Sequence, residues 1–314
     1  IGLALKFSGM KKGDKISILS QCRMEWVACD MGIIGIGGIT APIYHSNTSE
    51  QIRYIAEHSE AKFMFIEDQE QLDKILKIWD QVSNIKKLIV FDSYVPKDIP
   101  NVMLFSEFIH TGLDDHSFEQ HIDKSDPNDV ISFIYTSGTT GNPKAGVITN
   151  SNVISSIEHL PKMLDISQKD LTVAYLPLAH IAERLLGHFL KLVYGNQTAF
   201  AESIEDMPNN IRQVGPSILF GTPRVFEKFY AKIATSISDA TWIQKKIYHW
   251  AIGIGKEISI AKGSNSFSLK LKERLAKLLI YNKIKDIFGG RIRYMISGAA
   301  PISPDIVNFF KWMN

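Results

Sequence analysis

The sequence predicts an α/β fold with two subdomains, each a mainly parallel sheet layered with helices. Short runs of β-branched and aromatic residues, bounded by turn residues, alternate along the chain with segments of helical periodicity. Repeated strand-then-helix order favours parallel sheets. Some of the runs, such as ISFIY at 131–135, are almost continuously apolar, which is typical of strands covered on both faces.

The strands are expected in seven places. They are residues 15–20, 62–68, 86–92, 131–135, 171–176, 217–220 and 291–296. A helix is expected from Thr48 onward, where Ser49 and Glu50 precede an apolar i, i+3, i+4 pattern, and another over 69–82, whose apolar residues share one face. The apolar stretch 31–43 is interpreted as a continuing helix, and its 13 residues are too few to span a bilayer.

Length and composition suit two structural units. The chain has 314 residues, of which 45% are hydrophobic and 22% charged. We predict that residues 1–128 form a first α/β subdomain, ending in a connecting segment rich in Pro, Gly and Asp, and that 129–314 form a second. The chain opens at Ile1 without an initiator Met, so we expect a piece of a longer protein, truncated at both ends.

The overall charge conceals an asymmetry. Thirty-five Lys and Arg against 33 Asp and Glu give +2, which does not favour a nucleic-acid partner. Residues 241–285, however, hold ten basic against two acidic residues, a local charge of +8. Their apolar spacing predicts two basic amphipathic helices within 241–288. The favoured interpretation is a solvated lysine face on helices docked to the core; the alternative is attraction to anionic lipid or to a polyphosphate ligand.

Two cysteines, Cys22 and Cys29, match no common metal or redox spacing. We therefore expect reduced core thiols in a cytoplasmic protein.

The segment 135–147, YTSGTTGNPKAGV, has the composition of a phosphate-binding loop. It follows a predicted strand and precedes a helix expected near Ser151. Glycines allow backbone N–H groups to approach phosphate oxygens, hydroxyls add donors, and a lysine supplies charge. The candidate phosphate-binding residues are Thr136, Ser137, Gly138, Thr139, Thr140, Gly141 and Lys144. The alternative is a plain turn with an exposed lysine.

Two other nucleotide motifs do not fit. The Walker pattern fails because Lys144 does not follow a glycine directly and precedes no Ser or Thr. The dinucleotide fingerprint fails because Thr40 stands where the third glycine belongs after Gly35 and Gly37.

The sequence resembles the adenylate-forming (AMP-binding) superfamily, because residues 135–144 match the phosphate-loop motif of that family. The match ends at Ala145, where the family usually has glycine. Further segments resemble its long-chain fatty acyl-CoA synthetases in the same order: YLPLAHIAER at 175–184, GTPRVFEKFYAKI at 221–233 and ISGAAPIS at 296–303. The resemblance covers essentially the whole chain.

The resemblance implies ATP-dependent ligation of a long-chain fatty acid to coenzyme A through an acyl-adenylate, with ATP, Mg²⁺ and coenzyme A as cofactors or co-substrates. It places 129–150 on the ATP phosphates and 296–303 on adenine, through Gly298, Ala299, Ala300 and Pro301. For these four residues the alternative is a strand-end turn. It also places His180 near the carboxylate, whereas Glu183 and Arg184 are interpreted as a surface or interlobe pair.

The family's Mg²⁺ and ribose ligands, its catalytic lysine and its small C-terminal domain are expected beyond Asn314, so no metal site is expected here and these residues alone should be inert. Two alternatives stay open: a ligase for a medium-chain or aryl acid, and a nucleotide-binding pseudoenzyme or scaffold. An unrelated kinase is a distant third. Further expected partners are a membrane, contacted peripherally on its inner face through 241–285, and a second copy of the chain in a homodimer.

Overall fold

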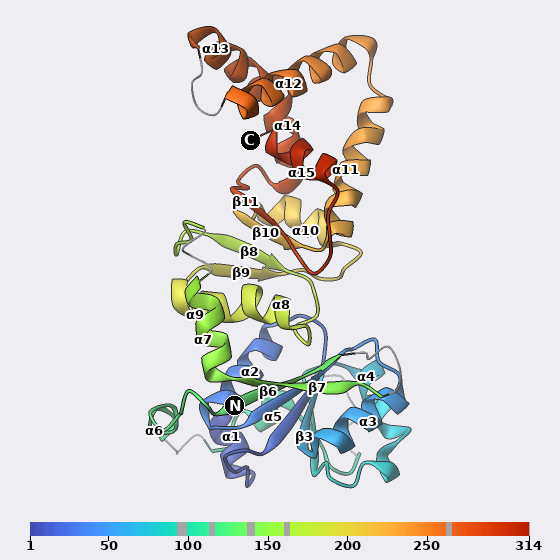
Figure 1. Ribbon diagram of the computed structural model, residues 1–314. Helices are drawn as coiled ribbons and strands as arrows, with labels where there is room; N and C mark the ends of the chain where they lie inside the picture. Colours follow the sequence, from blue (N-terminus) through green and yellow to red (C-terminus); the bar gives the residue numbers. More distant parts are fainter. Residues whose placement is uncertain (93–98, 113–116, 137–141, 160–163, 262–265, 314) are drawn as a thin grey trace. The chain divides into compact units, whose positions relative to one another are not determined.

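The computed structural model describes residues 1–92, 99–112, 117–136, 142–159, 164–261 and 266–313 (Figure 1). The chain divides into two compact units, one formed by 1–166 with 174–194 and the other by 167–173 with 195–314. These units do not coincide with the predicted division at 128, because the two strands that follow residue 128 join the sheet of the first unit.

The first unit contains a seven-stranded sheet in the order β5-β4-β3-β1-β2-β6-β7. Its strands are β1 (Lys15–Leu19), β2 (Ile39–Ile43), β3 (Ala61–Ile66), β4 (Lys87–Val90), β5 (Val102–Leu104), β6 (Val130–Thr136) and β7 (Lys144–Thr149). All adjacent pairs are parallel except β6 and β7, which are antiparallel. The parallel-dominated α/β architecture is therefore confirmed.

Helices cover both faces of this sheet. They are α1 (Gly2–Phe7), α2 (Met24–Gly35), α3 (Ser49–Ser59), α4 (Gln69–Leu76), α5 (Phe105–Phe108), α6 (Phe118–Ile122), α7 (Asn150–His159), α8 (Ile181–Glu183), a π-helical segment (Arg184–Phe189) and α9 (Leu190–Tyr194). Strand alternation separates two cores: Ile16 and Phe65 pack with α1, α2 and α5, while Met64 and Ile66 pack with α3 and α4.

The second unit contains a four-stranded sheet in the order β11-β10-β8-β9. Its strands are β8 (Leu171–Ala174), β9 (Gln197–Phe200), β10 (Ile218–Gly221) and β11 (Tyr294–Ser297). Its helices are α10 (Met207–Val214), α11 (Pro223–Ser238), α12 (Trp242–Ala261), α13 (Phe267–Ala276), α14 (Asn282–Lys285) and α15 (Pro304–Lys311), with a π-helical segment at Lys277–Tyr281. Strand β10 is parallel to both β8 and β11.

All seven predicted strands are present, with bounds that differ by three residues or fewer. The helix predicted from Thr48 is confirmed as α3, and Thr48 and Gln51 form a reciprocal capping box. The helix predicted over 69–82 is shorter, since α4 ends at Leu76.

Four strands were missed: β2, β5, β7 and β9. The expectation that 31–43 continues one helix is wrong, because α2 ends at Gly35 and Gly37 takes a positive φ of 76° before β2 begins.

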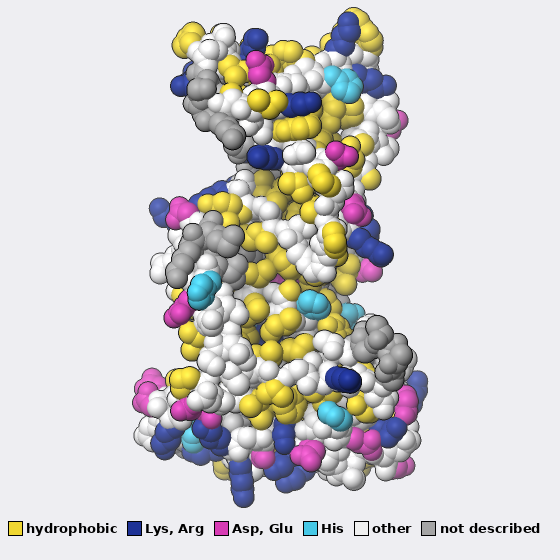
Figure 2. Space-filling view, viewed as in Figure 1, with side chains coloured by type: hydrophobic (Ala, Val, Ile, Leu, Met, Phe, Trp, Pro, Cys, Tyr) yellow, Lys and Arg dark blue, Asp and Glu magenta, His cyan; other side chains and the backbone are white. Residues whose placement is uncertain are grey.

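The basic segment forms the expected helices, but much of its apolar surface is exposed rather than docked to a core. Helix α12 buries only Ala251, Ile254 and Gly255. Trp242 is 67% exposed and Leu278 is also 67% exposed. Figure 2 shows hydrophobic side chains reaching the surface beside Lys and Arg over this part of the chain. No helix among the described residues is long and apolar enough to cross a membrane.

Candidate functional site

The two flanks of the predicted phosphate loop are adjacent strands. Thr136 is the last residue of β6 and Lys144 is the first residue of β7, and their Cα atoms are cross-strand partners. Both side chains are exposed. The loop between them therefore begins and ends at neighbouring positions of the sheet. The Thr136 hydroxyl stands at one end of this loop and the Lys144 ammonium group at the other.

The other predicted phosphate-binding residues, Ser137, Gly138, Thr139, Thr140 and Gly141, lie outside the described residues. The helix expected near Ser151 is present as α7, but β7 separates it from the loop. The loop therefore connects two antiparallel strands instead of leading directly into a helix.

Ala145 departs from the family's usual glycine, and its position explains why a methyl group is tolerated. It pairs with Tyr135 and packs, half-buried, against the core that includes α3 and α4. At Gly146, a Cβ would lie 3.6 Å from the Ile134 carbonyl oxygen, an ordinary contact distance. The start of β7 thus accepts small side chains at both positions.

Helix α3 holds both flanks of the loop. The Tyr54 hydroxyl donates a hydrogen bond to the Pro143 carbonyl at 3.0 Å. The Nδ1 atom of His58 lies 3.0 Å from the Tyr135 hydroxyl, and the rings of Tyr54 and His58 stack with centroids 5.4 Å apart. Burial raises the pKa of Tyr135 to about 12, so this hydroxyl stays protonated. We call these two contacts, from Tyr54 to Pro143 and from His58 to Tyr135, the clamp. Sequence reasoning missed the clamp because its partners are far apart in the chain.

A cavity of about 400 Å³ in the first unit brings Thr136 and Pro143 together with His180, whereas Lys144 is not among its lining residues. It is lined by Tyr44, Asn47, Gln51, Ile55, Ile134, Tyr135, Thr136, Pro143, His180 and Ile181. Residues 44 and 47 follow the carboxyl end of β2, and Thr136 is the carboxyl end of β6, so the cavity lies where parallel α/β sheets usually bind ligands.

His180 is the N-cap of α8. Its Nδ1 atom accepts a hydrogen bond from the Ala182 backbone N–H at 3.2 Å. This bond places the ring proton on Nε2, so the side chain is a hydrogen-bond donor at that atom.

The interpretation of Glu183 and Arg184 as a surface or interlobe pair is wrong. Both are buried, and Arg184 pairs with Asp30 instead. Burial raises the pKa of Glu183 to about 8, although the Leu176 backbone N–H donates to its carboxyl group. Burial therefore favours the neutral, protonated form of the Glu183 carboxyl group.

In the second unit, the predicted adenine loop follows β11. The Gly298 N–H donates to the Gly221 carbonyl at 3.3 Å, and Ala299, Ala300 and Pro301 are exposed. Ala299 has a φ of 69°, a left-handed conformation that alanine rarely adopts and that is found more often at functional sites. The loop is therefore exposed from Ala299 to Pro301 and has an unusual backbone conformation at Ala299.

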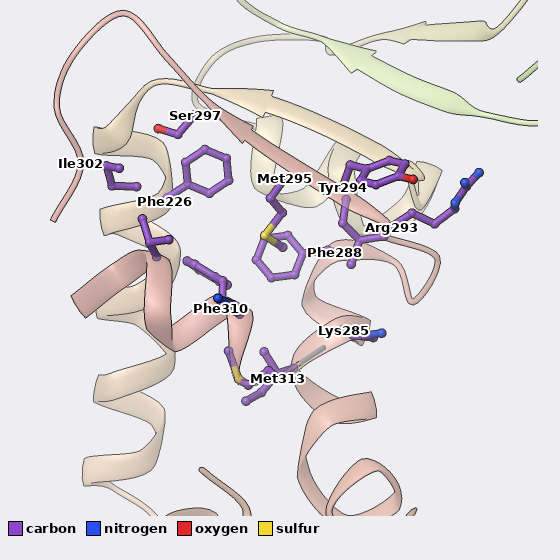
Figure 3. A pocket seen from close by; sticks show the side chains of 14 residues that line it. Phe226, Lys285, Phe288, Arg293, Tyr294, Met295, Ser297, Ile302, Phe310 and Met313 are labelled. Carbon is purple, nitrogen blue, oxygen red and sulfur yellow. The ribbon is translucent and has the colours of Figure 1, made fainter. Parts of the chain in front are cut away.

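A second cavity, of about 510 Å³, lies in the same unit (Figure 3). Phe226, Phe288 and Phe310 contribute aromatic rings to it, while the side chains of Lys285 and Arg293 point away from these rings. Its lining also includes Ser297 and Ile302, which lie within the predicted adenine loop 296–303, on either side of Gly298–Pro301. This cavity has a predominantly apolar wall beside an exposed loop.

A metal centre is not formed by the part of the chain that the structure describes, since no three or more His, Cys, Asp or Glu side chains gather there. The described cysteines are free, with Cys29 buried and Cys22 half-buried, as expected for core thiols.

Comparison with known proteins identifies relatives along nearly the whole chain. The chain is 32% identical over 316 residues to the long-chain-fatty-acid–CoA ligase ACSBG2 of Xenopus laevis, covering 98% of this chain and 43% of that protein. It is 29% identical to fatty acyl-CoA synthetase A of Dictyostelium discoideum, covering 99% and 46% respectively. The chain thus spans less than half the length of these relatives.

Solved structures show the same fold. The A-PCP didomain of carboxylic acid reductase from Segniliparus rugosus, in complex with AMP, superposes with a TM-score of 0.69 at 19% identity, over 99% of this chain and 43% of that chain. The N-terminal domain of FACL13 from Mycobacterium tuberculosis gives a TM-score of 0.68 at 16% identity, over 100% and 63%. The family described as AMP-binding enzyme matches residues 1–313, and the chain belongs to this family.

Proposed function

We propose that the protein is an acid–thiol ligase that activates a long-chain fatty acid with ATP. The carboxylate attacks the α-phosphorus of ATP to give an acyl-adenylate and pyrophosphate, and the thiol of coenzyme A then displaces AMP to give acyl-CoA. The observation that carries the proposal is the 32% identity to a long-chain-fatty-acid–CoA ligase over 98% of this chain. The cross-strand pairing of Thr136 with Lys144 supports it.

In this reaction the loop flanks hold the phosphates of ATP. The Lys144 ammonium group would neutralise phosphate charge, and the Thr136 hydroxyl would donate a hydrogen bond beside it, together with Ser137, Gly138, Thr139, Thr140 and Gly141. Charge-assisted hydrogen bonds of this kind are among the strongest that proteins make. The clamp from Tyr54 and His58 fixes both flanks before ATP arrives, which lowers the cost of ordering them on binding.

His180 would orient the fatty-acid carboxylate. Its Nε2–H is a donor, and its side chain lines the same cavity as Thr136. A carboxylate held by His180 beside phosphates held at Thr136 would have its oxygen directed at the reacting phosphorus. Orientation of two reactants contributes strongly to catalysis of this type.

Adenine would bind at Gly298, Ala299, Ala300 and Pro301. Ala299, Ala300 and Pro301 are exposed, and their small side chains would leave room for a flat ring whose edge could hydrogen-bond the loop backbone. Mg²⁺ is proposed only as the counter-ion of ATP, because the described residues gather no set of metal ligands and no catalytic step is assigned to it. Coenzyme A is the proposed acyl acceptor.

The substrate is tested with the natural protein and a series of acids from acetate to palmitate. We expect the release of AMP and pyrophosphate with coenzyme A to peak on long saturated chains. A peak on medium-chain or aromatic acids would assign the protein to another carboxylate. ATP binding without turnover of any acid would instead support the pseudoenzyme or scaffold alternative.

The helices α12 and α13 are proposed to contact an anionic membrane surface peripherally. Phe267 is 86% exposed and Trp242 is 67% exposed, on a segment whose local charge is +8. Exposed aromatic residues beside lysines suit the boundary between headgroups and acyl chains. Lys246 lies over the Trp242 ring, with Nζ 4.3 Å from the centroid, so cationic and aromatic groups reach the surface together.

Sedimentation with vesicles of phosphatidylcholine alone, or mixed with phosphatidylglycerol, tests this contact. We expect binding only to the mixed vesicles, weakening with salt and with Trp242→Ser. Ile122→Ser, at an apolar residue 47% exposed in the first unit, is the matched control. Equal binding to both vesicles would contradict the charge argument.

The homodimer remains a proposal that light scattering of the natural protein would test.

A further inference from the structure

A buried ionic network joins three elements of the first unit. Asp30 on α2 and Arg184 at the start of the π-helical segment have no exposed side-chain surface. Arg184 donates from Nε to Asp30 Oδ2 at 3.0 Å and from Nη2 to Asp30 Oδ1, a bidentate pair. The carboxylate also accepts a hydrogen bond from the Thr40 hydroxyl at 2.6 Å, and His188 Nε2 lies 3.1 Å from Oδ2. All four donor groups converge on one carboxylate.

Arg184 connects this network to the cavity through two further hydrogen bonds. Its Nη1 donates to the hydroxyl of Ser132, which lies on β6 four residues before Thr136. Its backbone N–H donates to the His180 carbonyl at 3.2 Å. One residue therefore contacts both the strand that ends at Thr136 and the residue that caps α8, and both Thr136 and His180 line the cavity of about 400 Å³.

The π-helical geometry supports these contacts. The segment Arg184–Phe189 directs both Arg184 and His188 at the same carboxylate. Gly187 leaves room for the Glu183 side chain, because a Cβ at position 187 would lie 2.1 Å from the Glu183 carboxyl oxygen and would displace it. π-Helical turns of this kind occur frequently at functional sites.

The charges of the network are fixed. Burial raises the pKa of Asp30, but the Arg184 charge and the hydrogen bonds from His188 and Thr40 outweigh burial, so this pKa lies below its ordinary value. Burial lowers the pKa of His188 despite the nearby Asp30, so the imidazole is neutral. A single buried ion pair remains, and such pairs contribute little more stability than apolar residues of similar volume. What they supply is orientation, through the planar fork of the guanidinium.

We infer that Arg184, held by Asp30, is a positioning residue that fixes His180 relative to Thr136 across the cavity. The inference rests on the proposed function, because it assigns the network to the step in which carboxylate and phosphate must meet. Arg184 acts through His180 and through β6, and it touches no substrate.

The test replaces both charges at once in the natural protein, as Asp30→Leu/Arg184→Met. Removing both partners avoids the unpaired buried charge that either single change would leave. We expect a moderate fall in the thermal midpoint, because the buried Thr40 hydroxyl and His188 lose their bonds to Asp30. We expect kcat for ATP–pyrophosphate exchange, measured below that midpoint, to fall about tenfold or more while KM for ATP stays near its wild-type value. An unchanged kcat would overturn the inference.

A second readout asks whether the network acts through His180. Exchange is measured for His180→Ala alone and combined with the double replacement. If the network positions His180, the combined variant is no slower than His180→Ala, since the effects are not additive. Full multiplication of the two losses would show that the network only stabilises the fold and would overturn the inference.

The matched control is Asp14→Asn/Lys62→Met. It removes an ion pair of 2.6 Å at the amino ends of β1 and β3, away from the carboxyl ends where the cavity lies. This control should change kcat only slightly. Combined with His180→Ala, its fold-change in kcat should multiply the fold-change caused by His180→Ala alone. If the double replacement does not fold, Ser132→Ala in the same cycle decides, because it leaves the Asp30–Arg184 pair in place and removes the hydroxyl that accepts from Arg184, together with the hydrogen bond of that hydroxyl to the Thr40 carbonyl. Absence of exchange in the wild-type protein would overturn the proposed function and the inference with it.

Discussion

Thr136 and Lys144 are cross-strand partners at the open end of the only antiparallel pair described in the first sheet. We therefore predict that Lys144→Ala weakens ATP–pyrophosphate exchange. Loss of a hydrogen bond to a charged group costs about 2 kcal/mol, which corresponds to roughly thirtyfold in rate. Lys86→Ala, at another exposed lysine of the same unit, is the control. An unchanged rate of ATP–pyrophosphate exchange in Lys144→Ala would contradict the proposal that Lys144 binds phosphate.

Tyr54→Phe is predicted to raise KM for ATP about fivefold with a smaller effect on kcat. The change deletes only the hydroxyl that donates to the Pro143 carbonyl, a hydrogen bond of about 1 kcal/mol, and leaves the ring stacked on His58. Steady-state kinetics at varied ATP measure the effect. Tyr194→Phe on α9 is the control, and equal KM values for the two variants would show that the clamp does not affect ATP binding.

Glu183 is predicted to make stability fall as pH rises. Its pKa is about 8 in the folded protein against 4.5 for an ordinary glutamate, chiefly because it is buried. Between these values the native state keeps a proton that the unfolded chain has released, so stability falls by up to about 1.4 kcal/mol per pH unit. This contribution is fully present below pH 4.5 and is lost as the pH rises through about 8.

Urea unfolding of the wild type and of Glu183→Gln at pH 5, 6, 7 and 8 measures this difference. The glutamine can still accept the Leu176 N–H but does not titrate. The variant should gain stability over the wild type steadily with pH. Parallel curves for the two proteins would contradict a protonated Glu183.

Both thiols are predicted to be unreactive in the folded protein. Burial raises the pKa of Cys22 and of Cys29, and only the thiolate is a good nucleophile. At pH 8, iodoacetamide should modify both residues in urea. In native buffer it should modify each of them much more slowly, as measured by mass spectrometry. Rapid native labelling of Cys22, with Cys22→Ser as the reference, would contradict this expectation.

The fold was predictable where the sequence signal is local. The capping box at Thr48 and the apolar run of β6 depend on neighbouring residues, and both are present. Strands β5 and β9, of three and four residues, carry little pattern of their own, and their partners in the sheet define them. Strand β2 was missed because an apolar run extends from α2 into β2, although Gly37 and Gly38 between them are a local signal for a break.

The site was predictable as a motif but not as an arrangement. The loop flanks and His180 were identified from the sequence, whereas the clamp from Tyr54 and the partnership of Asp30 with Arg184 join residues 89 and 154 positions apart. One signal was available for the second: Asp30 stands alone within the apolar run WVACDMGII, and a buried charge requires a partner. Composition could indicate that such a partner exists, but not which residue it is.

The antiparallel placement of β7 also has a consequence for hydrogen exchange. Within the described part of the sheet β7 is bonded to β6 alone, so it can open without separating any parallel pair. Amide protons of β7 should therefore exchange by local opening, while those of β1 and β3 should await global unfolding. The strand that presents Lys144 can then be the one whose protection increases most when a nucleotide is added.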